Sequence, residues 1–320
     1  MKGFIRKETH PFYVLLLLFA FMMAGYFVGS FIFAILASAM FNIGIMDMPE
    51  IATNPASHPN GRNIMLMLQG VIQFMSFVVG PLFMLRVLKY KIDPYLNWKM
   101  PVAPVLVLLA GLLMIIIMPA NSLVIHWNAD MHFPDFMQNF EQWARAKEDE
   151  LAELTKLIAV FDSFPKLLIG LLVIAVIPAI GEEIVFRGVL QKQLHRWTGN
   201  PHVAIWIAGL IFAAIHVQFF GFVPRAILGA LFGYLYFWSG RISVPIVAHL
   251  FNNGFTVLLL YLQQTGKVEF DVESTEPMSW WSVALSLVLS IGVLYYLYNE
   301  FKKVPVRTDV IPETATDYQV

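Results

Sequence analysis

Long stretches of this chain carry no charged side chain. Most of them are long enough to cross a bilayer, which takes about 20 mostly apolar residues. The fourth stretch becomes long enough only if it continues through Glu182, Glu183 and Arg187. The pattern predicts an all-α integral membrane protein with about eight transmembrane helices. The stretches without Asp, Glu, Lys or Arg are 11–46, 63–85, 100–129, 167–181, 203–224, 226–240, 242–266 and 277–299.

The charges between these stretches predict how the spans are oriented. We place the spans near 11–38, 64–88, 102–124, 166–190, 203–220, 223–239, 242–263 and 279–298. An even number of spans puts both termini on one side of the membrane. Lys and Arg concentrate before the first span and after the second, fourth, sixth and eighth spans. Because cytoplasmic segments are enriched in Lys and Arg, we expect both termini to be cytoplasmic.

The composition agrees with a membrane location and excludes several kinds of chemistry. Hydrophobic residues make up 58% and charged residues 13% of the chain, against roughly 25% charged in a soluble domain. The net charge of −1 gives no indication of nucleic-acid binding. The absence of cysteine excludes disulfides, thiol catalysis, Cys-ligated zinc and lipid attachment to Cys. The first apolar run is far longer than a signal-peptide core, so we expect a retained first helix rather than a cleaved signal.

The segment 131–165 mixes charged and apolar residues. Its apolar residues recur at helical spacing, as at Phe136, Phe140 and Trp143. This spacing is typical of an amphipathic helix that lies on the non-cytoplasmic membrane surface or caps the bundle. A solvated linker helix fits the same pattern.

Ionisable side chains at membrane depth are costly and usually functional. Those that stand out here, with one neighbouring amide, are Glu182, Glu183, Arg187, His216, His249 and Asn253. Glu182 and His216 are each 17 residues from Gly199, in the turn between the fourth and fifth spans. An antiparallel hairpin therefore places these two side chains at one level. His249 and Asn253 are four residues apart and share one helix face.

The two adjacent glutamates are expected to have different roles, because neighbouring residues on a helix point about 100° apart. Glu183 reaches Arg187 four residues on, which favours a structural ion pair. Glu182 is then free to face His216 and to act as a general base toward a water that His216 helps to hold. The polar pair on the seventh span would supply side-chain N–H donors that stabilise an oxyanion.

The same residues admit other interpretations. Glu182, His216 and His249 could hold zinc with a water in the open position, although no His-Glu-x-x-His motif is present. We favour activation of water without a cofactor and keep zinc as the alternative. Each polar group could also be purely structural, as a buried ion cluster, a core histidine or a bridge between helices. A non-catalytic protein, such as a bacteriocin-immunity or scaffold factor or a transporter, is the alternative from another class, but the inverted repeats of a transporter are not evident.

At these residues the chain resembles the CPBP family, which comprises CAAX proteases and bacteriocin-processing (Abi) proteins and includes Rce1-like enzymes. The family pattern Glu-Glu-x-x-x-Arg, Phe-x-x-x-His and His-x-x-x-Asn is present in that order, at 182–187, 212–216 and 249–253. The resemblance covers about residues 165–258.

The resemblance implies an intramembrane endopeptidase of the cell membrane, the inner membrane of a prokaryote, with an active site open to the cytoplasm. It implies a membrane-associated peptide or protein as substrate, and the prenylated substrates of eukaryotic relatives are not carried over. The family is described both as metalloproteases and as metal-independent glutamate proteases, so zinc stays open. The implied catalytic residues are Glu182, His216, His249 and Asn253, with Glu183 and Arg187 as supporting residues.

These observations together predict how the chain is divided. The expected parts are transmembrane helices one to three at 1–130, an amphipathic extramembrane segment at 131–165, a catalytic bundle of helices four to eight at 166–300, and a disordered cytoplasmic tail at 301–320.

Overall fold

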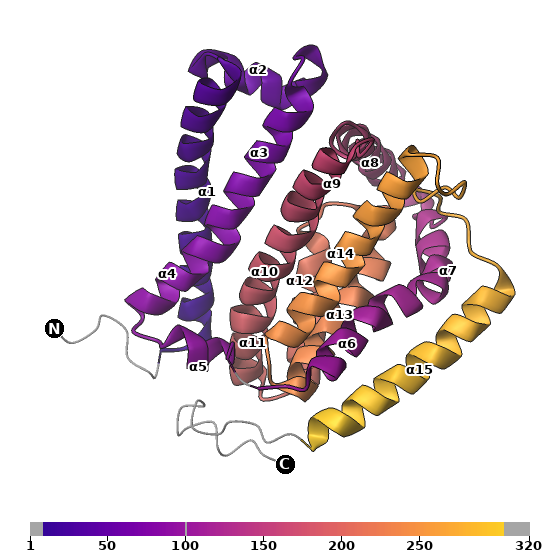
Figure 1. Ribbon diagram of the computed structural model, residues 1–320. Coiled ribbons are helices and arrows are strands. Elements are labelled where there is room, and N and C mark those ends of the chain that lie inside the picture. The colour runs from indigo at the N-terminus through magenta and orange to yellow at the C-terminus, as the bar shows by residue number, and fades with distance from the viewer. Residues whose placement is uncertain (1–8, 100, 304–320) are drawn as a thin grey trace.

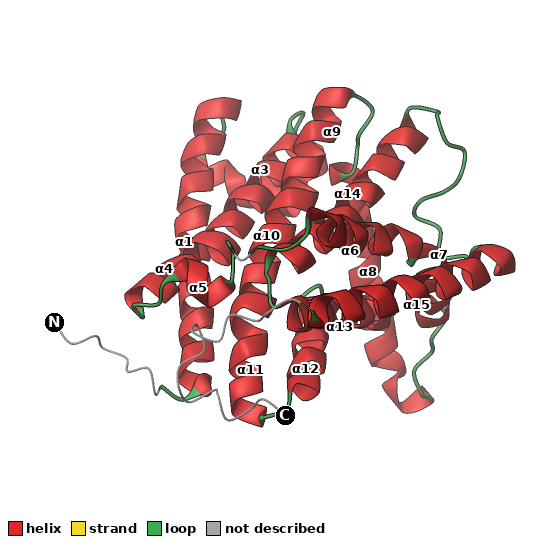
Figure 2. Ribbon diagram, turned by 60° about the horizontal axis from the view of Figure 1, so that its bottom comes forward, coloured by secondary structure: helices red, strands yellow, loops and turns green. Residues whose placement is uncertain are grey.

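The computed structural model describes residues 9–99 and 101–303, and these residues form helices and loops without any strand (Figures 1 and 2). The predicted all-α fold class is confirmed. The α-helices are α1 (Pro11–Phe41), α2 (Met48–Thr53), α3 (Gly61–Gln73), α4 (Gly80–Val87), α5 (Ile92–Leu96), α6 (Pro104–Ile116), α7 (Met118–Ala129), α8 (Gln138–Ile158), α9 (Phe164–Gly170), α10 (Ile177–Glu183), α11 (Gln191–Thr198), α12 (Pro201–Ala214), α13 (Phe222–Ser239), α14 (Ser243–Gln264) and α15 (Trp280–Lys302). The 3₁₀ segments are η1 (Ile45–Asp47), η2 (Pro55–Ser57), η4 (Asp135–Met137) and η7 (Phe219–Gly221), and the π-helical segments are η3 (Phe74–Val79), η5 (Leu171–Val176) and η6 (Ile184–Leu190).

Six helical runs of the described residues are long and apolar enough to cross a membrane, and the count rises to seven if α6 and α7 form one bent span. The chain is therefore a multi-pass membrane protein. The six runs are Pro11–Phe41, Gly61–Val87, Phe164–Thr198, Phe219–Ser239, Ser243–Gln264 and Trp280–Lys302.

Two of the eight predicted spans differ from the expected form. The third is bent by 44° between α6 and α7, where Pro119 lies in the first turn of α7 and cannot donate a backbone hydrogen bond. The fifth, expected over 203–220, ends at Ala214 and leaves α12 only 14 residues long. Of the roughly eight expected spans, the described residues thus show six or seven candidates by length and composition.

The described chain begins and ends at the same end of the bundle. The start of α1 and the end of α15 both lie at the lower end of the view in Figure 1. An even number of crossings produces this arrangement, while the cytoplasmic location of that end stays a prediction. Of the tail predicted at 301–320, the first two residues belong to α15, and 304–320 lie outside the described residues.

The hairpin between α11 and α12 forms at the turn that the sequence predicts. Gly199 ends α11 with φ +68°, a left-handed conformation that glycine adopts without steric cost. The side-chain oxygen of Asn200 then accepts the backbone N–H groups of His202 and Val203, and Pro201 opens α12. Helix α11 thereby continues the α9–α10 run and turns directly into α12.

Helices α12 and α13 pack through glycine. A Cβ atom on Gly209 would lie 2.9 Å from the backbone nitrogen of Ala230, and one on Gly229 would lie 3.0 Å from the Cα atom of Gly209. Small residues of this kind let two membrane helices approach until their backbones touch. The close approach brings the carbonyl oxygen of Gly229 within reach of the α9–α11 run.

The amphipathic segment forms α8. Only Ala144 of this helix is buried, and α8 contacts α3 and η7. The packing agrees with the predicted cap on the bundle. The predicted position of this helix at the membrane surface stays a prediction.

Three π-helical segments interrupt the helices that carry polar side chains. Segment η3 ends two residues before Pro81, and η5 ends two residues before Pro178. Proline cannot donate to the preceding turn and its ring crowds the carbonyl there, so the backbone widens at these places. The third segment, η6, contains Arg187.

Candidate active site

Glu183 and Arg187 form an ion pair with both side chains fully buried. The Nη1 atom of Arg187 donates to Oε1 of Glu183 at 2.9 Å, and both side chains are 0% exposed. The Nη2 atom of Arg187 donates to the carbonyl oxygen of Gly229 at 2.5 Å. The predicted pairing of these two residues is confirmed, and the glycine contact between α12 and α13 supplies the second acceptor.

The same glutamate also orients His249. Nδ1 of His249 lies 2.9 Å from Oε1 of Glu183, so Nδ1–H donates to the carboxylate. The imidazole stacks on the ring of Phe232 at a centroid distance of 4.9 Å and an angle of 13°. These contacts fix the ring plane and leave Nε2 of His249 as the nitrogen that faces the remaining polar groups.

Two polar side chains lie near Nε2 of His249. The Nδ2 atom of Asn253 lies 3.2 Å from Nε2 of His249 and donates to it, and its other N–H donates to the carbonyl oxygen of Ile174 at 3.2 Å. Oε2 of Glu182 lies 3.9 Å from the same Nε2. The expected sharing of one helix face by His249 and Asn253 is confirmed, and the face points at Glu182.

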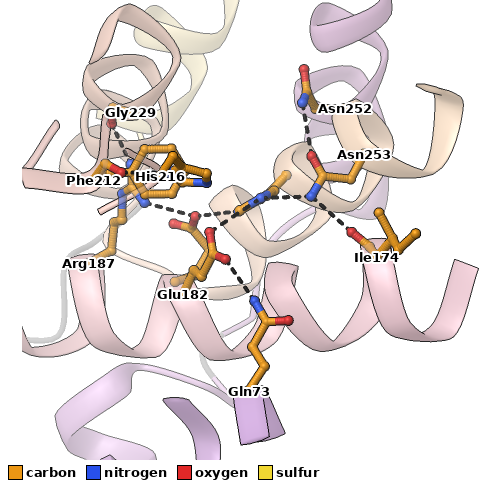
Figure 3. Close-up of polar contacts among 11 residues, drawn as sticks. Gln73, Ile174, Glu182, Arg187, Phe212, His216, Gly229, Asn252 and Asn253 are labelled. Atoms are coloured by element: carbon orange, nitrogen blue, oxygen red, sulfur yellow. Dashed lines mark hydrogen bonds and ion pairs between the residues drawn. The ribbon is translucent and has the colours of Figure 1, made fainter. Parts of the chain in front are cut away.

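Glu182 differs from its neighbour in both partner and exposure. Its side chain is 9% exposed whereas that of Glu183 is 0% exposed. Oε1 of Glu182 accepts a hydrogen bond of 2.9 Å from Nε2 of Gln73 (Figure 3). Arg187 balances the charge of Glu183. Of the two adjacent glutamates, Glu182 is therefore the one with no Lys or Arg in direct contact among the described residues.

His216 lies at the edge of this group. Its Nδ1 donates to the carbonyl oxygen of Phe212 at 2.7 Å, and the Phe212 ring contacts both His216 and His249, with centroid distances of 5.0 and 5.9 Å. No hydrogen bond or ion pair joins His216 to Glu182 in the described part of the chain. The structure thus brings Glu182 to His249 rather than to His216, because α12 ends before the level of His216.

The residues considered as zinc ligands do not form a metal-binding arrangement. In residues 9–99 and 101–303, no group of three His, Cys, Asp or Glu side chains is placed to hold a metal ion. Both ring nitrogens of His249 have partners, and no hydrogen bond or ion pair joins His216 to Glu182 among the described residues. The described residues thus do not bring Glu182, His216 and His249 together as a ligand set, and zinc stays an alternative prediction.

Two contributors to the site were not predicted from the sequence. Gln73 comes from α3, outside the fourth to seventh spans, and the carbonyl oxygen of Ile174 is exposed to Asn253 by the π-helical segment η5. A search for polar residues of every kind, rather than for ionisable ones, would have found Gln73 inside an uncharged apolar stretch. A backbone carbonyl leaves no such signal in the sequence.

The fold defines a multi-pass membrane protein, and the segment that holds most of the site is similar to a known family. The family model described as Type II CAAX prenyl endopeptidase Rce1-like matches residues 164–255, which hold all six predicted site residues. The chain is 36% identical over 113 residues to the membrane-embedded CAAX protease MroQ of Staphylococcus aureus (strain USA300), covering 33% of this chain and 44% of that protein. It is 32% identical over 107 residues to the protein YpbD of Bacillus subtilis (strain 168), covering 32% of this chain and 52% of that protein.

The match therefore spans about half the length of these curated relatives. The family-model match at residues 164–255 includes the six predicted site residues and leaves out Gln73 together with α1, α3 and α8. No solved structure matches the chain.

Proposed function

We propose that this protein is an intramembrane endopeptidase that hydrolyses a peptide bond of a membrane-associated substrate. The observation that carries the proposal is the buried contact of Glu182, His249 and Asn253 inside the Rce1-like segment. Hydrolysis of an amide requires a base for water and donors for an oxyanion, and these three side chains offer both.

Glu182 acts as the general base. Its carboxylate takes a proton from water, the hydroxide adds to the carbonyl carbon of the substrate, and the proton is delivered to the leaving nitrogen as the carbon–nitrogen bond breaks. Gln73 orients the carboxylate through Oε1 and leaves Oε2 toward His249. His216, whose Nδ1–H is engaged, presents Nε2 as an acceptor for the second O–H of the water.

Asn253 and His249 stabilise the oxyanion. Both N–H groups of Asn253 are engaged, one by Ile174 and one by His249, so the substrate oxygen replaces one of these acceptors. His249 donates to the oxyanion through Nε2–H once Nε2 has taken a proton from solvent before the reaction. Glu183 holds Nδ1–H and stabilises this imidazolium, the role that a buried carboxylate has beside a catalytic histidine. We place the opening of the site toward the cytoplasm, following the distribution of Lys and Arg.

The test compares the membrane proteomes of cells that express the wild-type protein, Glu182→Gln or Glu153→Gln. Glu153 is a matched control, since its side chain on α8 is 75% exposed. We expect at least one membrane protein to accumulate uncleaved in Glu182→Gln cells alone, and its terminus gives the cleavage sequence. Identical proteomes in all three strains would contradict a peptidase and favour a non-catalytic membrane protein.

Metal dependence is tested with the purified protein. Both ring nitrogens of His249 are engaged, one by Glu183 and one by Asn253. We therefore expect activity to survive a strong chelator. One metal ion per chain, lost together with activity in His216→Ala, would contradict this expectation.

A further inference from the structure

The segment that carries His216 has a backbone conformation that its own residues disfavour. Helix α12 ends at Ala214, and His216 and Val217 form a turn before η7. Val217 has φ +53°, in the left-handed region where a β-branched side chain is an outlier. Such a conformation persists only when surrounding contacts determine it. The contacts that hold this turn come from helices outside the α12–α13 hairpin.

Helix α8 supplies one set of these contacts. Oε1 of Glu148 accepts the backbone N–H of Phe220 at 3.1 Å. The guanidinium of Arg145 lies over the ring of Phe220 at 4.0 Å from its centroid, and Glu141 accepts two hydrogen bonds from that guanidinium at 3.0 and 2.9 Å. Backbone and side chain of Phe220 are thus both held by charged residues one turn apart on α8.

Aromatic packing joins the same two elements. The ring of Phe219 meets the rings of Phe140 and Trp143 with centroid distances of 5.1 and 5.5 Å. These are the apolar residues that gave α8 its amphipathic pattern. From the opposite side, the fully buried Asn128 of α7 donates to the carbonyl oxygen of Phe219 at 3.3 Å and accepts from the N–H of Val223 at 2.8 Å.

A side-chain contact within the α12–α13 hairpin joins α13 to the turn that carries His216. The Nη2 atom of Arg225 on α13 donates to Oε1 of Gln218, two residues after His216. A shift of η7 would therefore also displace His216, which precedes Phe220 by four residues.

We infer that α8 is a positioning element of the active site, with Glu148 and Arg145 as positioning residues that set the location of His216 through η7. The inference rests on the proposed function, in which His216 holds the attacking water. It extends the site to a helix outside the Rce1-like segment 164–255.

The test measures kcat and KM in lipid nanodiscs with a quenched fluorescent peptide that carries the cleavage sequence from the proteome comparison. The variants are Glu148→Ala, Glu148→Gln and the matched control Glu153→Ala, which lies on the exposed face of the same helix. We expect Glu148→Ala to lower kcat by about 10- to 100-fold with KM unchanged, since a misplacement of about 1 Å has an effect of this size. Glu148→Gln keeps an oxygen that accepts the Phe220 N–H and should retain most of the turnover.

A second measurement needs no substrate. Hydrogen exchange of the peptide that contains residues 215–221 should become faster in Glu148→Ala and stay unchanged in Glu153→Ala. Equal exchange in the two variants would overturn the inference, as would equal kcat.

The double variant Glu148→Ala/His216→Ala separates this inference from the proposed function. If α8 acts through His216, the double variant is no slower than His216→Ala alone. A further loss by the same factor as in Glu148→Ala would show that α8 acts elsewhere. Wild-type turnover in His216→Ala would instead refute the role of His216 in the proposed function.

Discussion

At the scale of residues, one histidine ring connects the two adjacent glutamates. Nδ1 of His249 contacts Glu183 at 2.9 Å and its Nε2 lies 3.9 Å from Glu182. The carboxylate matched by Arg187 holds the ring, and the other carboxylate faces its free edge. The two glutamates therefore contribute in different ways to one group.

The two glutamates should respond differently to the same substitution. We expect Glu182→Gln to abolish cleavage while the protein stays folded and abundant, since glutamine keeps size and hydrogen bonding but is not a base. Glu183→Gln leaves the charge of Arg187 buried and unpaired, a loss of about 3–5 kcal/mol in the free energy of unfolding. Abundance in membranes and thermal unfolding of the purified variants give the measurement, and a folded Glu183→Gln with full stability would contradict this account.

Asn253→Ala distinguishes an oxyanion donor from a bridge between helices. Loss of one oxyanion donor lowers kcat by about 10²–10³-fold, and we expect this change with little change in KM. A purely structural role, through Ile174, would instead lower thermal stability and leave the turnover of folded molecules nearly intact. Asn252→Ala is the matched control, because among residues 9–99 and 101–303 Asn252 contacts the site through one hydrogen bond, which its Nδ2 donates to Oδ1 of Asn253.

The sequence predicted the ionisable part of the site but not all of its contacts. Charged residues in apolar stretches are conspicuous, and the spacing of Glu183 with Arg187 and of His249 with Asn253 determined their contacts within each helix. The contact of Glu183 with His249 was not predicted, because it depends on how α10 and α14 are rotated against each other. Spacing along one helix carries no information on that rotation.

At the scale of elements, the distance between α12 and α13 determines where Arg187 finds its acceptor. Gly209 and Gly229 bring the two backbones together, and the carbonyl oxygen of Gly229 accepts from Arg187. The early end of α12 also explains why His216 does not contact Glu182 as expected. Residue counting assumes an uninterrupted helix, whereas α12 stops at Ala214.

A pair of glycine substitutions tests this packing. A Cβ atom on Gly209 meets backbone at 2.9 Å, whereas one on Gly292 of α15 meets nothing within 4 Å. We expect Gly209→Ala to lower the thermal unfolding temperature and Gly292→Ala to leave it unchanged or slightly raised, since alanine favours a helix by about 1 kcal/mol. The same unfolding temperature for both variants would show that the contact between α12 and α13 adjusts without cost.

At the scale of the whole molecule, the site is assembled from parts that lie far apart in the chain. Gln73 on α3 and the fourth, fifth and seventh predicted spans meet in one region. Helix α8 holds η7 from outside residues 164–255, the segment that the family model matches. The all-helical architecture and the hairpin turn at Gly199 followed from the sequence. The bend at Pro119 did not, because proline in a membrane helix is compatible with either a straight or a bent span.

Reporter fusions test the predicted orientation. A fusion after Lys89 should report the cytoplasm, and fusions after Asp149 and Glu273 should report the opposite side, since Lys and Arg concentrate in the connections on the first side. A cytoplasmic reporter at Asp149 would reverse the orientation and would place α8 on the side to which we assign the opening of the site.

The π-helical segments make the register of the chain a property of the site in its own right. Each of the three adjoins or contains a residue of the site: η3 follows Gln73, η5 contains Ile174, and η6 contains Arg187. Winding the residues of η5 as a regular α-helix, with none removed, would turn α10 by about 100° relative to α9. Glu182 would then face a different neighbour although every residue of the site remained. A distant homologue that keeps the motifs therefore keeps their geometry only if it also keeps these widened turns or has one residue fewer at each of them.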